Sequence, residues 1–354
     1  MGLLICLSAM VVNRRQATNP PTPLPLQYPA YFGNRLFIPD SNPCTVEGVA
    51  LGRRLFYETR LSANNSVSCS FCHRQELAFT DGGAFSVGID GSLTNRSSMS
   101  LANLAWSRHY FWDGRADGLE EQARTPLTNP HEMGQELAVS ARKLQATKTY
   151  PLLFKKAFGS TVITGNGIVN ALAQFERTLI SCNSKYDKYL RGEYQPTTSE
   201  LNGIALFYTN PDPAGNIRGA ACSHCHSGPK TFAELYHNNG LDSLSKDAGR
   251  EDISKQPADK GRFRVVTLRN IALTAPYMHD GRFQTLPAVV DHYSDHITSS
   301  HTLSIFLQIN SNTVNGTQLD LTAQEKHDLV AFLQMLTDST FITDKRFSNP
   351  FVKK

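Results

Sequence analysis

The sequence lacks long apolar runs, blocks of like charge and clear strand signals. Its formal charge of +4 is distributed over 354 residues, so nothing in it favours nucleic acid as a partner. The apolar stretch Met1–Val12 is too short to span a bilayer and has no basic segment before it. We interpret residues 1–12 as an atypical candidate export signal. Cys6 is a candidate lipidation site, although Ile5 is larger than the residue expected before a lipidated cysteine.

Length and composition predict two domains. A chain of 354 residues exceeds what one hydrophobic core usually serves, and 40% apolar residues support real cores. Prolines crowd the segment after the candidate signal, which predicts an irregular arm over residues 13–42. We place an N-terminal domain at 43–165 and a C-terminal domain at 166–354.

Apolar periodicity predicts an all-α fold. Thr197 with Glu200 and Thr322 with Glu325 have the spacing of capping boxes, which open helices ending near Tyr208 and Leu336. The further expected helices are Val46–Tyr57, Gln135–Thr147, Gly167–Ser181 and Thr285–Tyr293.

Four of the seven cysteines form two C-x-x-C-H units, Cys69–His73 and Cys222–His226. Two thiols within one turn can bond both vinyl groups of one porphyrin, and the adjoining histidine then falls beneath the iron. The sequence therefore predicts two covalently attached c-type hemes, one per domain. A similar five-residue segment that begins with glycine and ends with Leu-Phe precedes each unit, Gly52–Phe56 and Gly203–Phe207. This similarity indicates a duplicated unit in which a helix is followed by a heme attachment site.

Other interpretations of these cysteines have weaker support in the sequence. Two C-x-x-C pairs can bind zinc, but the separation of the two units and the histidine in each argue against it. A redox dithiol would need a strand-then-helix setting that neither unit has. Cys44 and Cys182 remain, and both a disulfide between them and two free thiols stay open.

Three further strings resemble the bacterial diheme cytochrome c peroxidase family, and most closely its methylamine-utilisation (MauG-type) branch. They are Phe111–Ala116, Asn129–Gly134 and Ala275–Gly281, and their order and spacing match the family over about residues 46–341. The resemblance implies a peroxide site at the first heme, with Glu132 as acid and base, flanked by Pro126 and Gln122. A carboxylate suits this role because it can move the proton of peroxide from one oxygen to the other.

The resemblance also assigns residues between the domains. Trp112 corresponds to the tryptophan that couples the two hemes, whereas Trp106 has no such match and is expected to pack in a core. Thr274 and Pro276 match carbonyl ligands of a calcium ion. Ser97 stands at the position of the family's third calcium ligand, an asparagine.

Two departures shift the interpretation within the family. The segment 88–96 has no histidine to close the first heme, so we expect an open iron there without reductive activation. The helix after the third string ends in Tyr293 where peroxidases place methionine. A phenolate favours higher oxidation states of iron than a thioether does. Rivals of Tyr293 as axial ligand are Met278, His279, His292 and His296.

We therefore predict a diheme peroxidase in the periplasm that reduces hydrogen peroxide with electrons from a small cytochrome, a cupredoxin or another periplasmic donor. The alternative is a MauG-like oxidase that uses peroxide to modify aromatic side chains of a partner protein. Against a close copy of that enzyme, Ala220 stands where it carries a surface tryptophan. A pure electron carrier is disfavoured because it needs neither an open iron nor Glu132.

Overall fold

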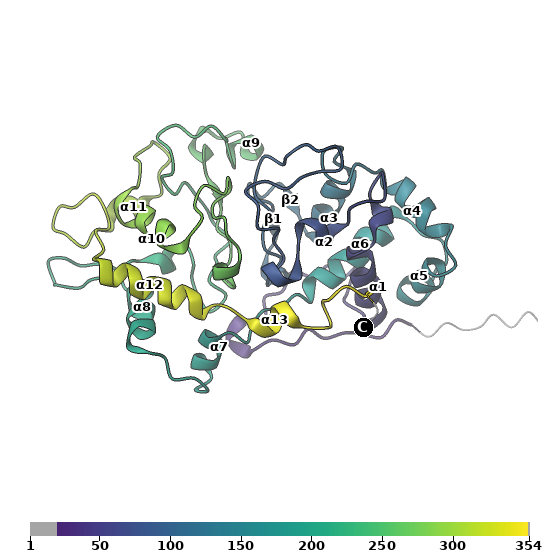
Figure 1. Cartoon of the computed structure of the whole chain (residues 1–354), viewed down its shortest axis with the longest axis horizontal. Coiled ribbons are helices and arrows are strands. Elements are labelled where there is room, and N and C mark those ends of the chain that lie inside the picture. The colour runs from purple at the N-terminus through teal and green to yellow at the C-terminus, as the bar shows by residue number, and fades with distance from the viewer. Residues whose placement is uncertain (1–19, 353–354) are drawn as a thin grey trace, which may run out of the picture.

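The structure, a computed structural model, describes residues 20–352 and consists of two lobes side by side (Figure 1). The candidate export signal and Cys6 lie outside the described residues. The described chain is mostly helical, as expected. Its α-helices are α1 (Val46–Phe56), α2 (Cys69–Cys72), α3 (Leu119–Thr128), α4 (Leu137–Gln145), α5 (Tyr150–Phe158), α6 (Gly165–Arg177), α7 (Lys185–Leu190), α8 (Thr198–Tyr208), α9 (Glu251–Ser254), α10 (Leu286–Asp295), α11 (Ile305–Ile309), α12 (Ala323–Met335) and α13 (Ser339–Thr343).

Two short antiparallel ribbons face one another between the lobes' helices. They are β1 (His109–Tyr110) with β2 (Ala116–Asp117), and β3 (Tyr236–His237) with β4 (Phe263–Arg264). The backbone N–H of Arg264 donates to the carbonyl of Trp112 at 2.7 Å. This bond joins β4 to the loop between β1 and β2, so segments far apart in the sequence meet there.

Local caps define the helix starts that the sequence predicted. Thr197 accepts a hydrogen bond from the backbone N–H of Glu200, whose carboxylate accepts one in return from the backbone N–H of Thr197. Thr322 and Glu325 form the same reciprocal box at α12. Each box satisfies two N–H groups that a helix start otherwise leaves without partners.

A duplicated pair of crossing helices builds the two lobes. Gly52 of α1 lies against the backbone of α6, where an added Cβ would be 1.9 Å from the carbonyl oxygen of Ala171. Gly203 of α8 lies against α12 in the same way, at 2.0 Å from the carbonyl oxygen of Asp328. Four residues after each glycine, a phenylalanine packs edge-to-face on another phenylalanine of the opposite helix, Phe56 on Phe175 and Phe207 on Phe332.

The hydrophobic cores do not divide at residue 165. Helix α6 lies beyond that position but packs on α1 and α3, and it buries Leu172 and Phe175 in the core of the first lobe. The chain also returns to this core near its end through Phe341 and Phe347. The second core consists of α8, α10 and α12 with the loops beside them.

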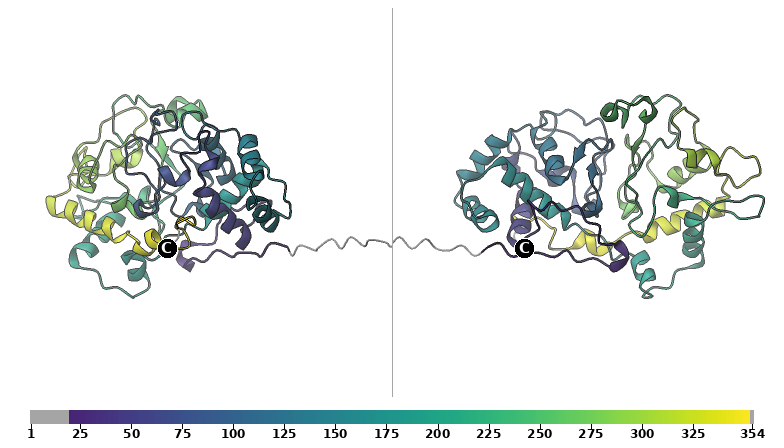
Figure 2. Two further views of the ribbon diagram at one scale, coloured as in Figure 1. Left: turned by 45° about the vertical axis from the view of Figure 1, so that its right-hand side comes forward. Right: turned by 180° about the vertical axis from the view of Figure 1, so that it is seen from behind.

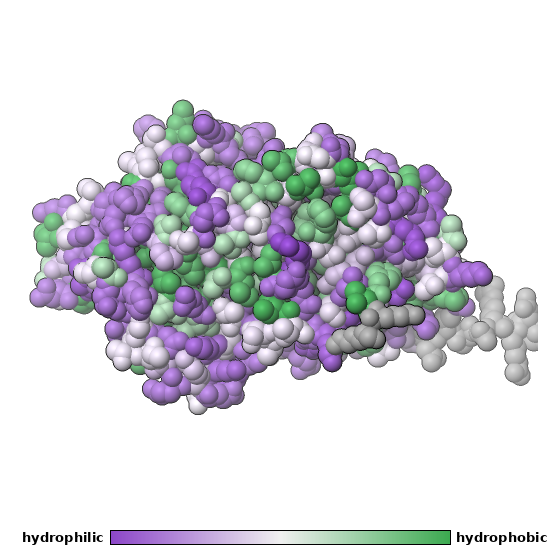
Figure 3. Space-filling model, viewed as in Figure 1, coloured by the Kyte–Doolittle hydropathy of each residue, from purple (hydrophilic) through white to green (hydrophobic). Residues whose placement is uncertain are grey.

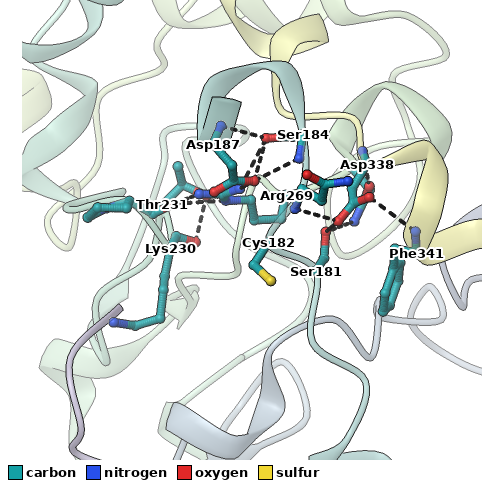
Figure 4. Close-up of polar contacts among 12 residues, drawn as sticks. Ser181, Cys182, Ser184, Asp187, Lys230, Thr231, Arg269, Asp338 and Phe341 are labelled. Atoms are coloured by element: carbon teal, nitrogen blue, oxygen red, sulfur yellow. Dashed lines mark hydrogen bonds and ion pairs between the residues drawn. The ribbon is translucent and has the colours of Figure 1, made fainter. Parts of the chain in front are cut away.

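A buried polar network ties the connecting segment 178–184 and α7 to the second lobe (Figure 4). Arg269 and Asp187 form an ion pair whose side chains are both 0% exposed. Asp187 also accepts from Ser184, and from Tyr31 of the proline-rich arm. The arm therefore contacts both lobes, because Thr22 pairs with Val46 at its other end.

The aromatic Trp106 packs in a small core beneath this arm, as expected. Its ring contacts Tyr28 and Phe32 edge-to-face, and its Nε1 donates to the carbonyl of Gly33 at 2.9 Å.

The outer surface is mainly polar on the face shown in Figure 3, with apolar residues in small groups between charged ones. Figure 2 shows the same two lobes from behind. Within residues 20–352, no helix combines the length and apolar character that crossing a bilayer requires.

Candidate functional site

Each C-x-x-C-H unit lines a cavity of its own. The cavity beside Cys69, Cys72 and His73 has a volume of ≈ 1170 Å³. The cavity beside Cys222, Cys225 and His226 has a volume of ≈ 290 Å³ and a largely apolar wall. The two cysteines of each unit lie on one helical turn, α2 in the first lobe and a 3-10 turn in the second.

Both histidines have the same ring nitrogen, Nδ1, bonded to a backbone carbonyl. His73 Nδ1 lies 2.8 Å from the carbonyl oxygen of Phe79, and His226 Nδ1 lies 3.1 Å from that of Val266. A carbonyl can only accept, so Nδ1 carries the proton and Nε2 keeps its lone pair. Burial lowers the pKa of both rings, to about 4 for His226, which favours this neutral form.

The first cavity brings together Glu132, Gln122 and Pro126 with the first heme unit. Gln122 and Pro126 lie on α3, and Glu132 follows in the turn after it. Asn129, which the sequence analysis did not single out, donates from Nδ2 to Glu132 Oε1 at 2.7 Å. This bond fixes one carboxylate oxygen and leaves Oε2 without a protein partner among the described hydrogen bonds.

Segment 88–96 forms part of the same wall. A Cβ on Gly88 would lie 1.8 Å from the carbonyl oxygen of His131, and Ile89 donates its N–H to the carbonyl of Glu132 at 3.0 Å. The histidine on this side is His131, whose ring is exposed and lies 2.8 Å from Asp90 Oδ2. The close backbone packing holds this segment against the turn that carries Glu132.

Trp112 lines both cavities. Its indole Nε1 donates to the carbonyl of Ser97 at 3.0 Å, which fixes the plane of the ring. Trp112 is therefore part of the wall of both cavities, and its role in coupling the two hemes stays a prediction.

The second cavity contains Tyr293 together with its strongest rival. Asn239 donates from Nδ2 to Tyr293 Oη at 3.2 Å, and the same nitrogen lies 3.3 Å from Met278 Sδ. Burial raises the pKa of Tyr293 to about 12, while the bond from Asn239 lowers it. Asn239 was not identified from the sequence, because nothing local to it marks a ligand's neighbour.

Of the three rival histidines, His292 and His279 have other contacts and His296 is exposed. His292 Nε2 lies 3.0 Å from the carbonyl oxygen of Asn239. His279 is buried and stacks on Phe263 with ring centroids 3.8 Å apart, although it lines the second cavity. His296 is exposed at the end of α10.

The expected calcium ligands lie at the joint between the lobes. Thr274 and Pro276 line the second cavity, and the Ser97 hydroxyl donates to the carbonyl of Met278 at 2.9 Å. Two carbonyls and a hydroxyl lack the carboxylates that calcium sites usually include. Within residues 20–352, no group of three or more His, Cys, Asp or Glu side chains is arranged so that it could hold a metal ion. Calcium at this joint stays a prediction.

The remaining cysteines and Ala220 have structural surroundings. Cys44 and Cys182 are both free thiols. Cys44 is buried in the first lobe, whereas Cys182 packs on the small core around Trp106. Ala220 is buried at the wall of the second cavity.

The residues present fit two covalently bound hemes. Each cavity offers two thiols, an imidazole with a free Nε2 and apolar walls, which are what c-type attachment requires. Polar atoms on the cavity walls also lack partners among the described residues. They are Glu176 Oε2 in the first cavity, His237 Nε2 in the second, and Arg264 Nε, whose residue lines both.

Comparison with known sequences identifies relatives over most of the chain. Residues 46–195 match the family of the di-haem cytochrome c peroxidases. The methylamine utilization protein MauG of Methylorubrum extorquens is 35% identical over 84% of this chain and 80% of its own. The cytochrome c551 peroxidase of Nitrosomonas europaea is 36% identical over 70% of this chain and 73% of its own.

Solved structures have the same architecture. A MauG-like protein associated with microbial copper homeostasis superposes with a TM-score of 0.83 at 36% identity, over 93% of this chain and 100% of the other. The diheme peroxidase BthA of Burkholderia thailandensis superposes with a TM-score of 0.71 at 21% identity, over 93% of this chain and 98% of the other, and so supports the fold alone.

Proposed function

The chain belongs to the di-haem cytochrome c peroxidase family and carries two covalently bound heme c groups, and from this premise we propose that it reduces hydrogen peroxide in the first cavity. The observation that carries the proposal is the gathering of Glu132, Gln122 and Pro126 in one cavity with His73. His73 would bind the iron through Nε2, and Cys69 and Cys72 would hold the porphyrin.

The residues of the first cavity handle the protons of the reaction. When bound, the hemes supply the electrons, and each peroxide takes two electrons and two protons to give two water molecules. Glu132 takes a proton from one peroxide oxygen at its free Oε2 and returns it to the other, so that water can leave. Asn129 holds the opposite oxygen of this carboxylate and so keeps Oε2 directed at the proton. Gln122 and Pro126 limit the space beside it.

The second cavity receives the electrons in this proposal. His226 and Tyr293 would hold the second iron, and Trp112 lies on both cavity walls, where its ring would shorten the path between the two hemes. The electron donor is a small cytochrome, a cupredoxin or another periplasmic protein, and the site of action is the periplasm, where both peroxide and such donors occur.

Turnover by protein that has never been reduced tests the proposal. The segment 88–96 supplies no histidine to close the first iron, so the fully oxidised holoprotein should consume peroxide from the first addition once a reduced small cytochrome is present. Prior reduction should leave the initial rate unchanged. A lag that prior reduction abolishes would contradict the open first site, and no consumption under either condition would contradict the peroxidase itself.

A second function is favoured by Tyr293. A tyrosine at the second iron supports an oxidase that uses peroxide to modify aromatic side chains of a partner protein, since a phenolate stabilises oxidised iron. Low-temperature electron paramagnetic resonance of the ferric holoprotein and its Tyr293→Met variant tests this ligand. We expect one high-spin and one low-spin signal, with only the low-spin signal altered in the variant. Two low-spin signals that the substitution leaves unchanged would remove the support for this function.

A further inference from the structure

Arg264 is a buried cation without an acidic partner. It lies in β4 with 8% of its surface exposed, and no carboxylate among residues 20–352 forms an ion pair with it. Glu234 affects Arg264 only through long-range electrostatics. The Oε1 atom of Glu234 accepts a hydrogen bond from the backbone N–H of Arg108. Burying a charge without a partner is strongly unfavourable, so this arginine points to an anion that the protein itself does not supply.

Only one side of the guanidinium is bonded to protein. Nη1 donates to the carbonyl of His109 at 2.9 Å and to Ser107 Oγ at 3.1 Å. Nε is buried and has no partner in the described part of the chain. The edge formed by Nε and Nη2 is the edge with which arginine holds a carboxylate through two parallel hydrogen bonds.

The position of Arg264 narrows the identity of the anion. Of the residues that line both cavities, Arg264 is the charged one; the others are Ser97, Ser98, Met99, Ser100, Leu104 and Trp112. Its backbone is bonded to that of Trp112 at 2.7 Å, and its strand partner Tyr236 also has a buried hydroxyl without a bond. A carboxylate on the cofactor can reach this point from either cavity.

We propose that the Nε–Nη2 edge of Arg264 binds a heme propionate at the boundary of the two cavities, beside Trp112. The inference rests on the proposed function, because it requires both hemes in place. A propionate is a carboxylate and matches the free edge in shape and charge. The bond would fix the edge of one heme against the tryptophan and place the positive charge closer to that heme than to the other.

Potentiometric titration of the holoprotein tests the proposal. Replacing Arg264 with glutamine removes a positive charge that favours the reduced iron, so the Arg264→Gln variant should show a lower midpoint potential, with a larger decrease at the heme whose propionate Arg264 binds than at the other heme. The propionate bending mode in its resonance Raman spectrum should shift as well. Arg264→Lys keeps the charge but not the two-bond geometry, so it should restore most of the potential and leave the Raman mode shifted.

Arg262→Gln is the matched control, because Arg262 lies two residues away, pairs with Asp259 and lines neither cavity. Its potentials and Raman mode should equal those of the wild type. If Arg264→Gln behaves like Arg262→Gln, the proposal is overturned. Where Arg264→Gln fails to fold, an unshifted Raman mode in Arg264→Lys overturns it equally.

Heme content and peroxide turnover of the wild type distinguish a failure of the proposed function from a failure of the propionate bond. Fewer than two hemes per chain or no turnover would contradict the proposed function. Two hemes and normal turnover with unchanged potentials in Arg264→Gln would contradict the propionate bond alone.

Discussion

At the residue scale, one hydrogen bond decides which oxygen of Glu132 can act. Asn129 donates to Oε1, and Oε2 of this cavity-lining residue has no partner among the described hydrogen bonds. The sequence marks Glu132 through its family string, but it does not show this division of labour between the two oxygens, which depends on the turn after α3.

Replacing Glu132 with glutamine should lower kcat/KM for peroxide by roughly 10²–10⁴-fold, the usual contribution of a general acid–base group. The glutamine side chain keeps the shape of glutamate and can still accept the hydrogen bond from Asn129, but it cannot take the proton from peroxide. Steady-state peroxide consumption measures the effect. Glu136→Gln is the control, since Glu136 is exposed at the start of α4 and does not line the cavity. Equal rates for both variants would exclude Glu132 as the proton carrier.

Asn239 connects the two candidate ligands of the second iron, and its removal should change which of them binds. In Asn239→Leu, Tyr293 loses the bond that lowers its pKa, and Met278 loses its polar contact. We expect the ferric spectrum to change toward methionine ligation. Adding Met278→Leu to the same chain should abolish the new species. A spectrum that stays identical to the wild type would show that Tyr293 does not need Asn239.

At the element scale, the two helix crossings follow one plan. Gly52 lets α1 approach the backbone of α6, and Gly203 lets α8 approach that of α12. At each crossing, a phenylalanine of one helix packs edge-to-face on a phenylalanine of the other. In the sequence, each C-x-x-C-H unit follows the glycine-bearing helix of its crossing, α1 or α8, and precedes the helix that this one crosses, α6 or α12. The crossing therefore fixes where each cavity lies relative to its lobe.

Gly52→Ala and Gly203→Ala should each destabilise the protein, by roughly 1–3 kcal/mol, because the added methyl would overlap a backbone carbonyl that cannot move aside. Thermal unfolding of the holoprotein measures the loss. Gly167→Ala in α6 is the control, since its added Cβ would come no closer than 3.1 Å to Phe154 and would raise helix propensity. Unfolding midpoints that are equal in all three variants would contradict tight crossings.

At the scale of the whole molecule, the Arg269–Asp187 pair joins three parts of the chain. Ser184, just before α7, and Arg269 of the second lobe both contact Asp187 (Figure 4). Tyr31 of the arm donates its hydroxyl to the same carboxylate. Both charges are fully buried, so each depends on the other.

Asp187→Asn should cost about 3–5 kcal/mol of unfolding free energy, because it leaves the buried Arg269 without a countercharge. Asp242→Asn removes an ion pair with Arg282 that is 2.8 Å long and partly exposed, and should cost only about 0–1 kcal/mol. Denaturant unfolding of both variants provides the comparison. A similar small loss in both would show that the buried pair does not stabilise the joint.

Much of the fold was predictable because its determinants are local. The capping boxes at Thr197 and Thr322 and the apolar periodicity of α1 and α6 depend on neighbours within one or two turns. Helices α3 and α5, the short α7, α9, α11 and α13, and the place of α6 in the first core were not predicted, because packing between distant segments decides them.

The sequence by itself determined the two heme attachments, since two thiols and an imidazole within five residues need only one turn of chain to meet a porphyrin. Only the tertiary structure decided what surrounds them. Glu132 lies in the same cavity as His73, and Asn239 donates a hydrogen bond to Tyr293. Arg264 lies beside Trp112 without an acidic partner. All three arrangements join segments that are far apart in the chain. The spacing of neighbouring residues is enough to specify covalent heme attachment, whereas the walls of a cavity form only when distant segments of the chain pack together.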